Sequence, residues 1–261
     1  MRSSETELEY TEGYVAFIDI LGFKQFVSNP DNISKTKDIF DFVSKLQYFF
    51  NTTSKLKTKV AFFSDSIVLT TDEFDTQYLL IALWLAEDYL HKKTGLIFRG
   101  ALTKGLYYHE DIIAFGPAIV ESFFQEKEAK YSRIVIDNSI IKSLNHIPVE
   151  IMKDIDGKYC LNPVVASFYR FTNPATYKIT KEAIFKSLEY EKNMIIEDIK
   201  DNYYQDYSDK YIWRLRPYNI ICDNISKYIK AYGLEFSADE IDRVKQSRIA
   251  LKDSELAKKE L

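Results

Sequence analysis

The sequence predicts an α+β protein: an antiparallel-rich sheet with helices on one face, followed by a mainly helical C-terminal annex. Over the first 146 residues, short β-branched and aromatic runs occur in pairs between helical stretches. That order is typical of an antiparallel sheet and differs from the strict alternation of a doubly wound fold. From residue 147 onward, apolar residues follow helical spacing, so we expect domains over 1–146 and 147–261.

The elements expected first lie within residues 14–93. The apolar run Tyr14–Ile20 predicts a buried strand. Asn32 is a suitable N-cap for an amphipathic helix expected over Ile33–Thr53. The segment Lys59–Thr71 predicts a β-hairpin because two apolar runs meet at a Ser-Asp-Ser turn. The strongly apolar stretch Asp75–Lys93 predicts a second helix.

The next elements complete the predicted sheet. Two strands are expected over Leu96–Thr103 and Tyr107–Phe115, joined near Gly105. A Gly-Pro pair predicts a third helix over about 117–130, because proline suits the first helical position. The β-branched run Ser132–Asp137 predicts a further strand.

The C-terminal annex begins with turn signals and continues as helices. The Asp-Gly pair at 156–157 is typical of a hairpin turn. Helices are expected over Thr180–Lys200, Asp209–Tyr232 and Ser237–Lys259. The last begins with Ser-Ala-Asp-Glu, which has the spacing of a capping box.

Composition excludes several classes of function. The net charge of -4, from 35 Lys+Arg against 39 Asp+Glu, is unlike that of a general nucleic-acid binder. Cys160 and Cys222 are too few for a disulfide framework or a zinc site. The polar start has no signal-peptide pattern, and the longest apolar run, Tyr78–Ala86, is too short to span a bilayer core of ~30 Å. We therefore expect a cytoplasmic protein without nucleic-acid or membrane partners.

Two aspartates are the strongest candidates for chemistry. Asp19 lies inside the apolar run FIDILGF, and a buried carboxylate normally needs a cation, a metal or several donors as partner. Asp65 lies at the hairpin turn in FFSDSI. Each also has a structural interpretation, because aspartate is common at turns and caps.

Together the two aspartates are more informative. If the first strand pairs with the hairpin, both carboxylates emerge at the same end of the sheet. Two carboxylates can hold two divalent cations ~3.5–4 Å apart, the arrangement used for phosphoryl chemistry. Oxygen ligands of this kind favour Mg²⁺ or Mn²⁺.

Four motifs together resemble the class III nucleotide cyclase homology domain over about residues 13–137. They are FIDILGF, FFSDSIVL, RGALTKG from Arg99 and GPAIVES from Gly116. The resemblance implies a ferredoxin-like sheet and a two-metal site, Mn²⁺ or Mg²⁺, held by Asp19, Asp65 and the carbonyl of Ile20. It also implies a homodimer with composite sites.

Several positions depart from the pattern of purine cyclases. Ala61 stands where those enzymes carry a base-reading lysine or glutamate, and Ile113 where they carry aspartate or cysteine. Val120 and Phe124 align with the helix asparagine and arginine that support the transition state, and Leu106 with a triphosphate-binding arginine. With these departures, the chain is most similar to the pyrimidine cyclases of bacterial Pycsar anti-phage systems.

Other residues must then bind the substrate. Arg99, Lys104 and Arg133 are candidate cations for the triphosphate, and Phe23 or Phe63 for stacking on the base. The expected reaction converts UTP (or CTP) to the 3′,5′-cyclic monophosphate and pyrophosphate, and the cyclic nucleotide then reaches a downstream effector.

Two alternatives remain open. One is a catalytically degenerate cyclase-like module that binds a nucleotide or a partner. The other is a polymerase-like or diguanylate-forming enzyme, which shares the α+β core. That class calls for a glycine-rich acidic hairpin, and the FFSD run contains no glycine.

Overall fold

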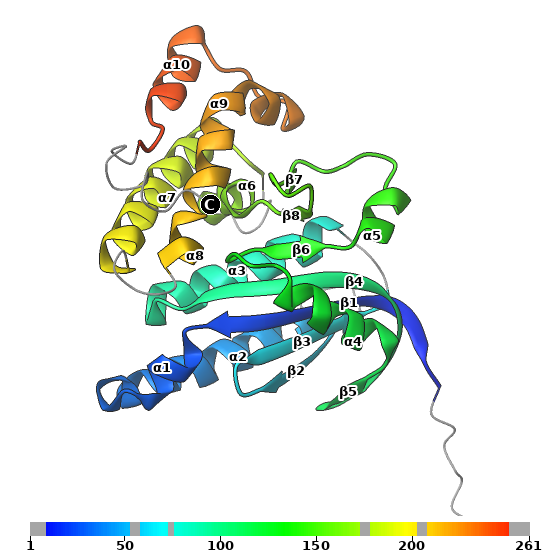
Figure 1. The fold of residues 1–261 in the computed structure, drawn as a ribbon. Helices are drawn as coiled ribbons and strands as arrows, with labels where there is room; N and C mark the ends of the chain where they lie inside the picture. The colour runs from blue at the N-terminus through cyan, green and yellow to red at the C-terminus, as the bar shows by residue number, and fades with distance from the viewer. Residues whose placement is uncertain (1–8, 53–57, 73–75, 173–177, 203–207, 251–261) are drawn as a thin grey trace, which may run out of the picture. The chain divides into compact units, whose positions relative to one another are not determined.

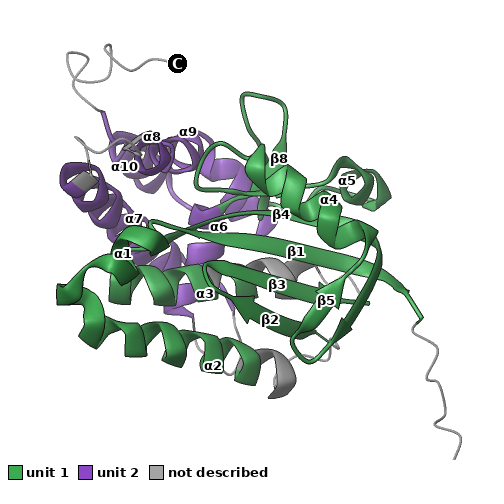
Figure 2. Ribbon diagram, turned by 60° about the horizontal axis from the view of Figure 1, so that its bottom comes forward, with its two compact units in different colours: residues 1–162 green, residues 163–261 purple. Residues whose placement is uncertain are grey.

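The computed structural model describes residues 9–52, 58–72, 76–172, 178–202 and 208–250. The described part of the chain is α+β, with several helices and a mixed sheet of 8 strands (Figure 1). The chain forms two compact units, residues 1–162 and 163–261 (Figure 2).

Unit 1 carries the sheet and the helices that cover it. Its described elements are β1 (Thr11–Leu21), α1 (Phe23–Ser28), the 3-10 helix η1 (Pro30–Lys35), α2 (Thr36–Thr52), β2 (Lys59–Phe63), β3 (Ser66–Thr71), α3 (Thr76–Thr94), β4 (Ile97–Glu110), β5 (Ile113–Phe115), α4 (Pro117–Lys127), β6 (Ile134–Ile136), α5 (Asn138–Ser143), β7 (Ile151–Lys153) and β8 (Tyr159–Leu161). Those of unit 2 are α6 (Pro163–Ser167), the 3-10 helix η2 (Phe168–Phe171), α7 (Lys181–Asn202), α8 (Ser208–Ile212), α9 (Leu215–Ala231) and α10 (Ala238–Gln246).

The strands follow the order β2-β3-β1-β4-β6-β8-β7, and β5 pairs with β4. The pairings are antiparallel except that β4 and β6 run parallel. The central strand β1 is buried on both faces, because adjacent residues Val15 and Ala16 are both inaccessible to solvent. This double burial explains why its sequence is an almost continuous apolar run.

Helices cover both faces of the sheet, so the expectation of helices on one face is wrong. On one side, the ring of Phe42 in α2 packs 5.9 Å from that of Phe98 in β4. On the other side, Ala118 of α4 packs against Val15 of β1. Figure 2 shows α2 and α4 on opposite sides of the strands. The physical reason is the double burial of β1, which needs apolar cover on each face.

Strand β4 is one long strand, although the sequence predicted two strands joined near Gly105. Gly105 pairs with Gly13 inside the ladder, and the chain turns only at Asp111, whose φ is 53°. A Cβ on Gly13 would lie 2.4 Å from the carbonyl oxygen of Thr71. Glycine at position 13 therefore permits a close backbone approach.

The sheet extends further along the chain than the sequence indicated. The predicted Asp-Gly turn at 156–157 joins β7 and β8, and β8 pairs with β6. The first unit therefore ends at Asn162 and includes residues that we expected in the annex. Strands β7 and β8 have three residues each and show no clear alternation of apolar and polar residues, so the sequence did not predict them as strands.

Of two helix N-caps predicted from the sequence, one is absent and one is present. The helix expected from Ile33 begins as α2 at Thr36, because η1 precedes it. The cap of η1 is Asn29, whose side chain accepts from the N–H of Asp31 over 3.0 Å, and Asn32 takes no part in it. In unit 2, the predicted capping box of Ser237 and Glu240 is present in α10. Residues 251–259 of that expected helix lie outside the described residues.

Among the described residues, no helix is both long enough and apolar enough to cross a membrane. Cys160 and Cys222 are buried, and neither forms a disulfide bond.

Candidate active site

Asp19 lies near the end of β1, on the face covered by α4. Its register partners are Ser66 on β3 and Arg99 on β4. Side chains alternate along a strand, so Phe17 shares the face of Asp19. The ring of Phe17 packs 5.3 Å from that of Phe123 in α4. The carboxylate of Asp19 thus emerges beside an aromatic contact between strand and helix.

Asp65 lies in the two-residue turn between β2 and β3. Its carbonyl oxygen accepts the N–H of Ile20 over 2.8 Å, which extends the ladder by one residue beyond the pairing of Asp19 with Ser66. Ser64, the other turn residue, has a φ of 56°. The turn and the end of β1 are therefore adjacent, as the two-aspartate hypothesis requires.

The segment after β1 turns sharply into a short helix. Gly22 has a φ of 83°, a left-handed conformation that favours glycine. Phe23 follows as the first residue of α1 and is half-buried. Phe63 ends β2 beside the Asp65 turn and is 83% exposed, so its ring is not part of the core. A large exposed aromatic ring next to the two aspartates is free to contact a ligand.

Arg99 bridges two carboxylates. Its Nε donates to Oε1 of Glu126 over 2.5 Å, and its NH2 donates to Oδ2 of Asp19 over 3.3 Å. Arg99 lies directly opposite Asp19 in the β1–β4 ladder, and Glu126 comes from α4. The guanidinium therefore neutralises Asp19.

Glu126 is the member of this group that the sequence analysis missed. Its side chain is buried, and burial raises the pKa of its carboxyl group while the neighbouring Arg99 guanidinium opposes that rise. A signal was present in the sequence, because Ala118, Ser122 and Glu126 recur every four residues and share the buried face of α4. A charged residue on such a face predicts a buried cation as partner.

Two of the candidate phosphate-binding cations, Lys104 and Arg133, do not lie beside Asp19. Lys104 is five residues from Arg99 on β4, so strand alternation puts it on the opposite face and about 17 Å along the strand. Its Nζ lies 3.6 Å from Glu12. Arg133 is fully buried and forms ion pairs with Asp154 and Asp156. Its guanidinium ties the start of β6 to the β7–β8 hairpin.

The donor set suits a hard divalent cation. Asp19, Asp65 and the carbonyl of Ile20 offer only oxygen, the ligand type that Mg²⁺ and Mn²⁺ prefer. Within the described ranges, no group of three or more His, Cys, Asp or Glu side chains is assembled as a metal site. A metal here would rely on two carboxylates, the main chain and the substrate.

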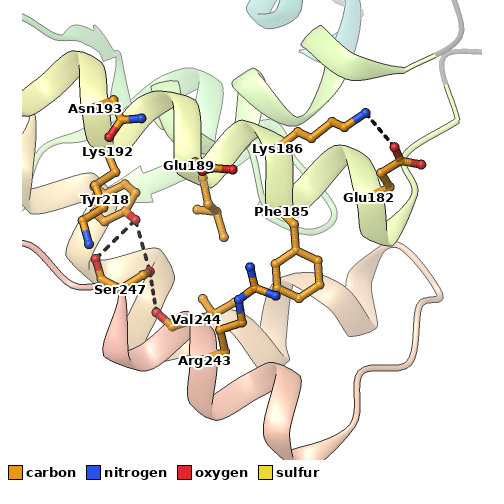
Figure 3. A pocket seen from close by; sticks show the side chains of 11 residues that line it. Glu182, Phe185, Lys186, Glu189, Lys192, Asn193, Tyr218, Arg243, Val244 and Ser247 are labelled. Atoms are coloured by element: carbon orange, nitrogen blue, oxygen red, sulfur yellow. Dashed lines mark hydrogen bonds and ion pairs between the residues drawn. The ribbon is translucent and has the colours of Figure 1, made fainter.

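The described surface also has two hollows. One, of about 430 Å³, lies along α4 and is lined by Phe124, Gln125, Asp137 and Tyr159, among others. The other, of about 600 Å³, lies in unit 2 between α7 and α10 (Figure 3). Its lining includes Tyr218, whose hydroxyl is hydrogen-bonded to Ser247 and whose pKa is raised by burial. Neither hollow is lined by Asp19, Asp65 or Arg99.

No protein-family model matches the chain, and a comparison with curated proteins gives no match. The assignment of a function therefore depends on the motifs and on the geometry above.

Proposed function

We propose that this chain is a metal-dependent pyrimidine nucleotide cyclase, which converts UTP or CTP to the 3′,5′-cyclic monophosphate and pyrophosphate. One observation carries the proposal. The hydrogen bond from the N–H of Ile20 to the carbonyl oxygen of Asp65 places the hairpin turn beside the end of β1, so Asp19 and Asp65, which are distant in the sequence, lie at the same end of the sheet. Arg99 adds a cation at the same place.

The reaction needs positioning and charge neutralisation more than covalent chemistry from the protein. The ribose 3′-oxygen forms a bond to the α-phosphorus, and the bond from that phosphorus to the pyrophosphate oxygen breaks. Mg²⁺ or Mn²⁺, when bound, stabilises charge on the attacking and leaving oxygens. Asp19 and Asp65 would hold the cations, and Arg99 would bind the phosphates.

The topology is compatible with a cyclase homology domain. The order β2-β3-β1-β4 forms an antiparallel core with the hairpin beside the first strand. We therefore propose that unit 1 is a ferredoxin-like cyclase homology domain with extra strands β6, β8 and β7 at one edge. Unit 2 is proposed as an accessory helical domain.

Loss of purine readout supports a pyrimidine substrate. Ala61 lies in β2 and is buried, and Ile113 lies in β5 and is exposed. Neither side chain can form a hydrogen bond with a base edge, because neither has a donor or an acceptor atom. Uracil and cytosine differ by one donor–acceptor exchange, which a single contact can read. The exposed ring of Phe63 is the better placed of the two aromatics for stacking on the base, since Phe23 is half-buried.

A homodimer accounts for the exposed apolar residues of β4, β5 and α4. Large apolar side chains are exposed there, namely Leu106, Ile113, Phe115, Val120 and Phe124. Val120 and Phe124 are one turn apart on α4 and form an exposed apolar strip, which is typical of a protein interface. Four of the five occupy positions at which related cyclases carry substrate-contacting residues. A second copy would cover this surface and complete the composite sites.

The proposed product is a diffusible messenger. A cyclic pyrimidine nucleotide carries a signal to a separate effector, which suits a cytoplasmic role in anti-phage defence. The cyclase-like module without turnover remains the second candidate. It is favoured by the hydrophobic residues Leu106, Val120 and Phe124 at positions that carry polar groups in active cyclases.

Product identification tests the proposal. The protein is incubated with each of ATP, GTP, CTP and UTP and Mn²⁺, with and without phage extract, and the products are separated by chromatography and mass spectrometry. The expected result is cyclic UMP or cyclic CMP, lost in Asp19→Asn and Asp65→Asn and retained in the control Asp242→Asn, an exposed residue of α10. Nucleotide-dependent dimerisation without any cyclic product would support the second candidate.

A further inference from the structure

Arg99 forms ion pairs with two carboxylates that differ in their exposure to solvent. The Glu126 side chain is 3% exposed and lies 2.5 Å from Nε. The Asp19 side chain is 22% exposed and lies 3.3 Å from NH2. Coulombic attraction is stronger where solvent is excluded, and breaking a buried pair leaves a costly unpaired charge. The contact with Glu126 is therefore the fixed one, and the contact with Asp19 is the exchangeable one.

A second arginine in the same unit shows what a closed structural network looks like. The guanidinium of Arg133 has no exposed surface and is held by Asp154 and Asp156. The side chain of Arg99 is 20% exposed. Unlike that of Arg133, the Arg99 side chain, which contacts Asp19, is thus accessible to solvent.

We propose that Glu126 is a positioning residue that anchors Arg99 while its outer nitrogen exchanges between Asp19 and a phosphate of the substrate. The inference rests on the proposed function, since it takes Asp19 as a metal ligand. A cation bound to Asp19 competes with the guanidinium for the carboxylate and frees the NH2 group. A phosphate bound to the NH2 group frees Asp19 in turn. Metal and phosphate then bind with positive coupling, and the coupling is reciprocal.

The metal alone tests this exchange without turnover. Free Mn²⁺ is measured by electron paramagnetic resonance during titration of the dialysed full-length protein. In Glu126→Gln, Arg99 keeps Asp19 as its sole anionic partner among the described residues, so the affinity for Mn²⁺ is expected to fall. In the double variant Arg99→Gln/Glu126→Gln, the competing cation is gone and no buried charge is left unpaired. Its affinity for Mn²⁺ is expected to rise by about fivefold or more.

These opposite signs separate exchange from a purely structural network, which predicts equal or reduced affinity in both variants. Asp19→Asn should abolish Mn²⁺ binding, which would assign the bound ion to the site at Asp19. The matched control is Glu128→Gln/Lys158→Gln, which removes an exposed ion pair of 3.2 Å and should leave the affinity unchanged. Thermal unfolding of each variant establishes that it is folded during the titration.

Phosphate provides the reciprocal measurement. Inorganic phosphate should raise the affinity of the wild-type protein for Mn²⁺, and the double variant should lose that enhancement. Unchanged Mn²⁺ affinity in both variants overturns the exchange, whether or not the protein is a cyclase. The predicted pattern of affinities without cyclic product from any nucleotide contradicts the proposed function and leaves the exchange standing.

Discussion

The main-chain N–H of Ile20 donates to the carbonyl oxygen of Asp65 over 2.8 Å, so the β2–β3 turn is tied to the end of β1. The two aspartates are 46 positions apart in the chain, as the difference between 65 and 19 gives. A hydrogen bond between backbone atoms fixes this proximity independently of either carboxylate. Conservative changes of the two side chains should therefore alter metal binding without changing the fold.

The turn itself offers a test of this geometry. Ser64 adopts a φ of 56°, which glycine tolerates and a β-branched residue does not. Ser64→Val should destabilise the protein by about 1–2 kcal/mol and weaken Mn²⁺ binding by displacing Asp65. Ser64→Gly is the matched control and should keep both properties close to wild type. Urea unfolding and Mn²⁺ titration measure them, and equal Mn²⁺ affinities for the two variants would count against the role of the turn.

Lys104 and Arg99 should behave differently although both lie in the RGALTKG motif. Lys104→Gln should leave the KM for the nucleotide within about twofold, because its side chain lies on the other face of the sheet. Arg99→Gln should raise that KM by about tenfold or more, the loss expected for one charge-assisted contact to phosphate. Steady-state kinetics of both variants decide the point. A larger effect at Lys104 would contradict the assignment of faces.

The exposed apolar residues of α4 predict a dimer. Phe124→Glu puts a charge into the proposed interface and should shift the protein toward monomer in sedimentation velocity. Activity should fall with it, because composite sites need both copies. Phe40→Glu is the control, since Phe40 is similarly exposed but lies on α2. A monomeric wild-type protein with full activity would rule out the composite site.

Asp156 predicts how stability depends on pH. Its hydrogen bond from the Arg133 guanidinium lowers the pKa of Asp156 below its ordinary value. A lowered pKa in the folded state stabilises the protein above the ordinary carboxyl pKa of about 4 and loses that stabilisation as pH falls through the folded-state value. In Asp156→Asn, the free energy of unfolding should therefore fall less steeply than in the wild type as pH is lowered below about 4. Urea unfolding over this range measures the slope, and an unchanged slope would exclude Asp156 as its source.

Local sequence signals were sufficient for part of the site. The apolar run around Asp19 and the Ser-Asp-Ser turn predicted a strand and a hairpin, and the structure has both as β1 and β2–β3. Their adjacency followed from assuming that the hairpin pairs with the first strand. Periodicity and turn chemistry are short-range properties, so they transfer directly from sequence to structure.

The remaining features depend on contacts between distant residues. Charge type alone does not distinguish Arg99 from Arg133, because their partners are distant in the chain. Glu126, on a helix, lies 27 positions after Arg99, and Asp154, in a hairpin, lies 21 positions after Arg133. Gly105 reads as a turn by composition, whereas its actual role is to pair with Gly13 in a continuous ladder. Glycine signals backbone freedom without saying which conformation uses it.

The most direct test of the central claim is ³¹P nuclear magnetic resonance of UTP and of CTP incubated with the protein and Mg²⁺. We expect cyclic phosphodiester and pyrophosphate to form together in equal molar amounts from one of these nucleotides. Neither product should form with Asp19→Asn or Asp65→Asn. Intact nucleotide, or release of orthophosphate without a cyclic phosphodiester, would contradict cyclase activity of this protein.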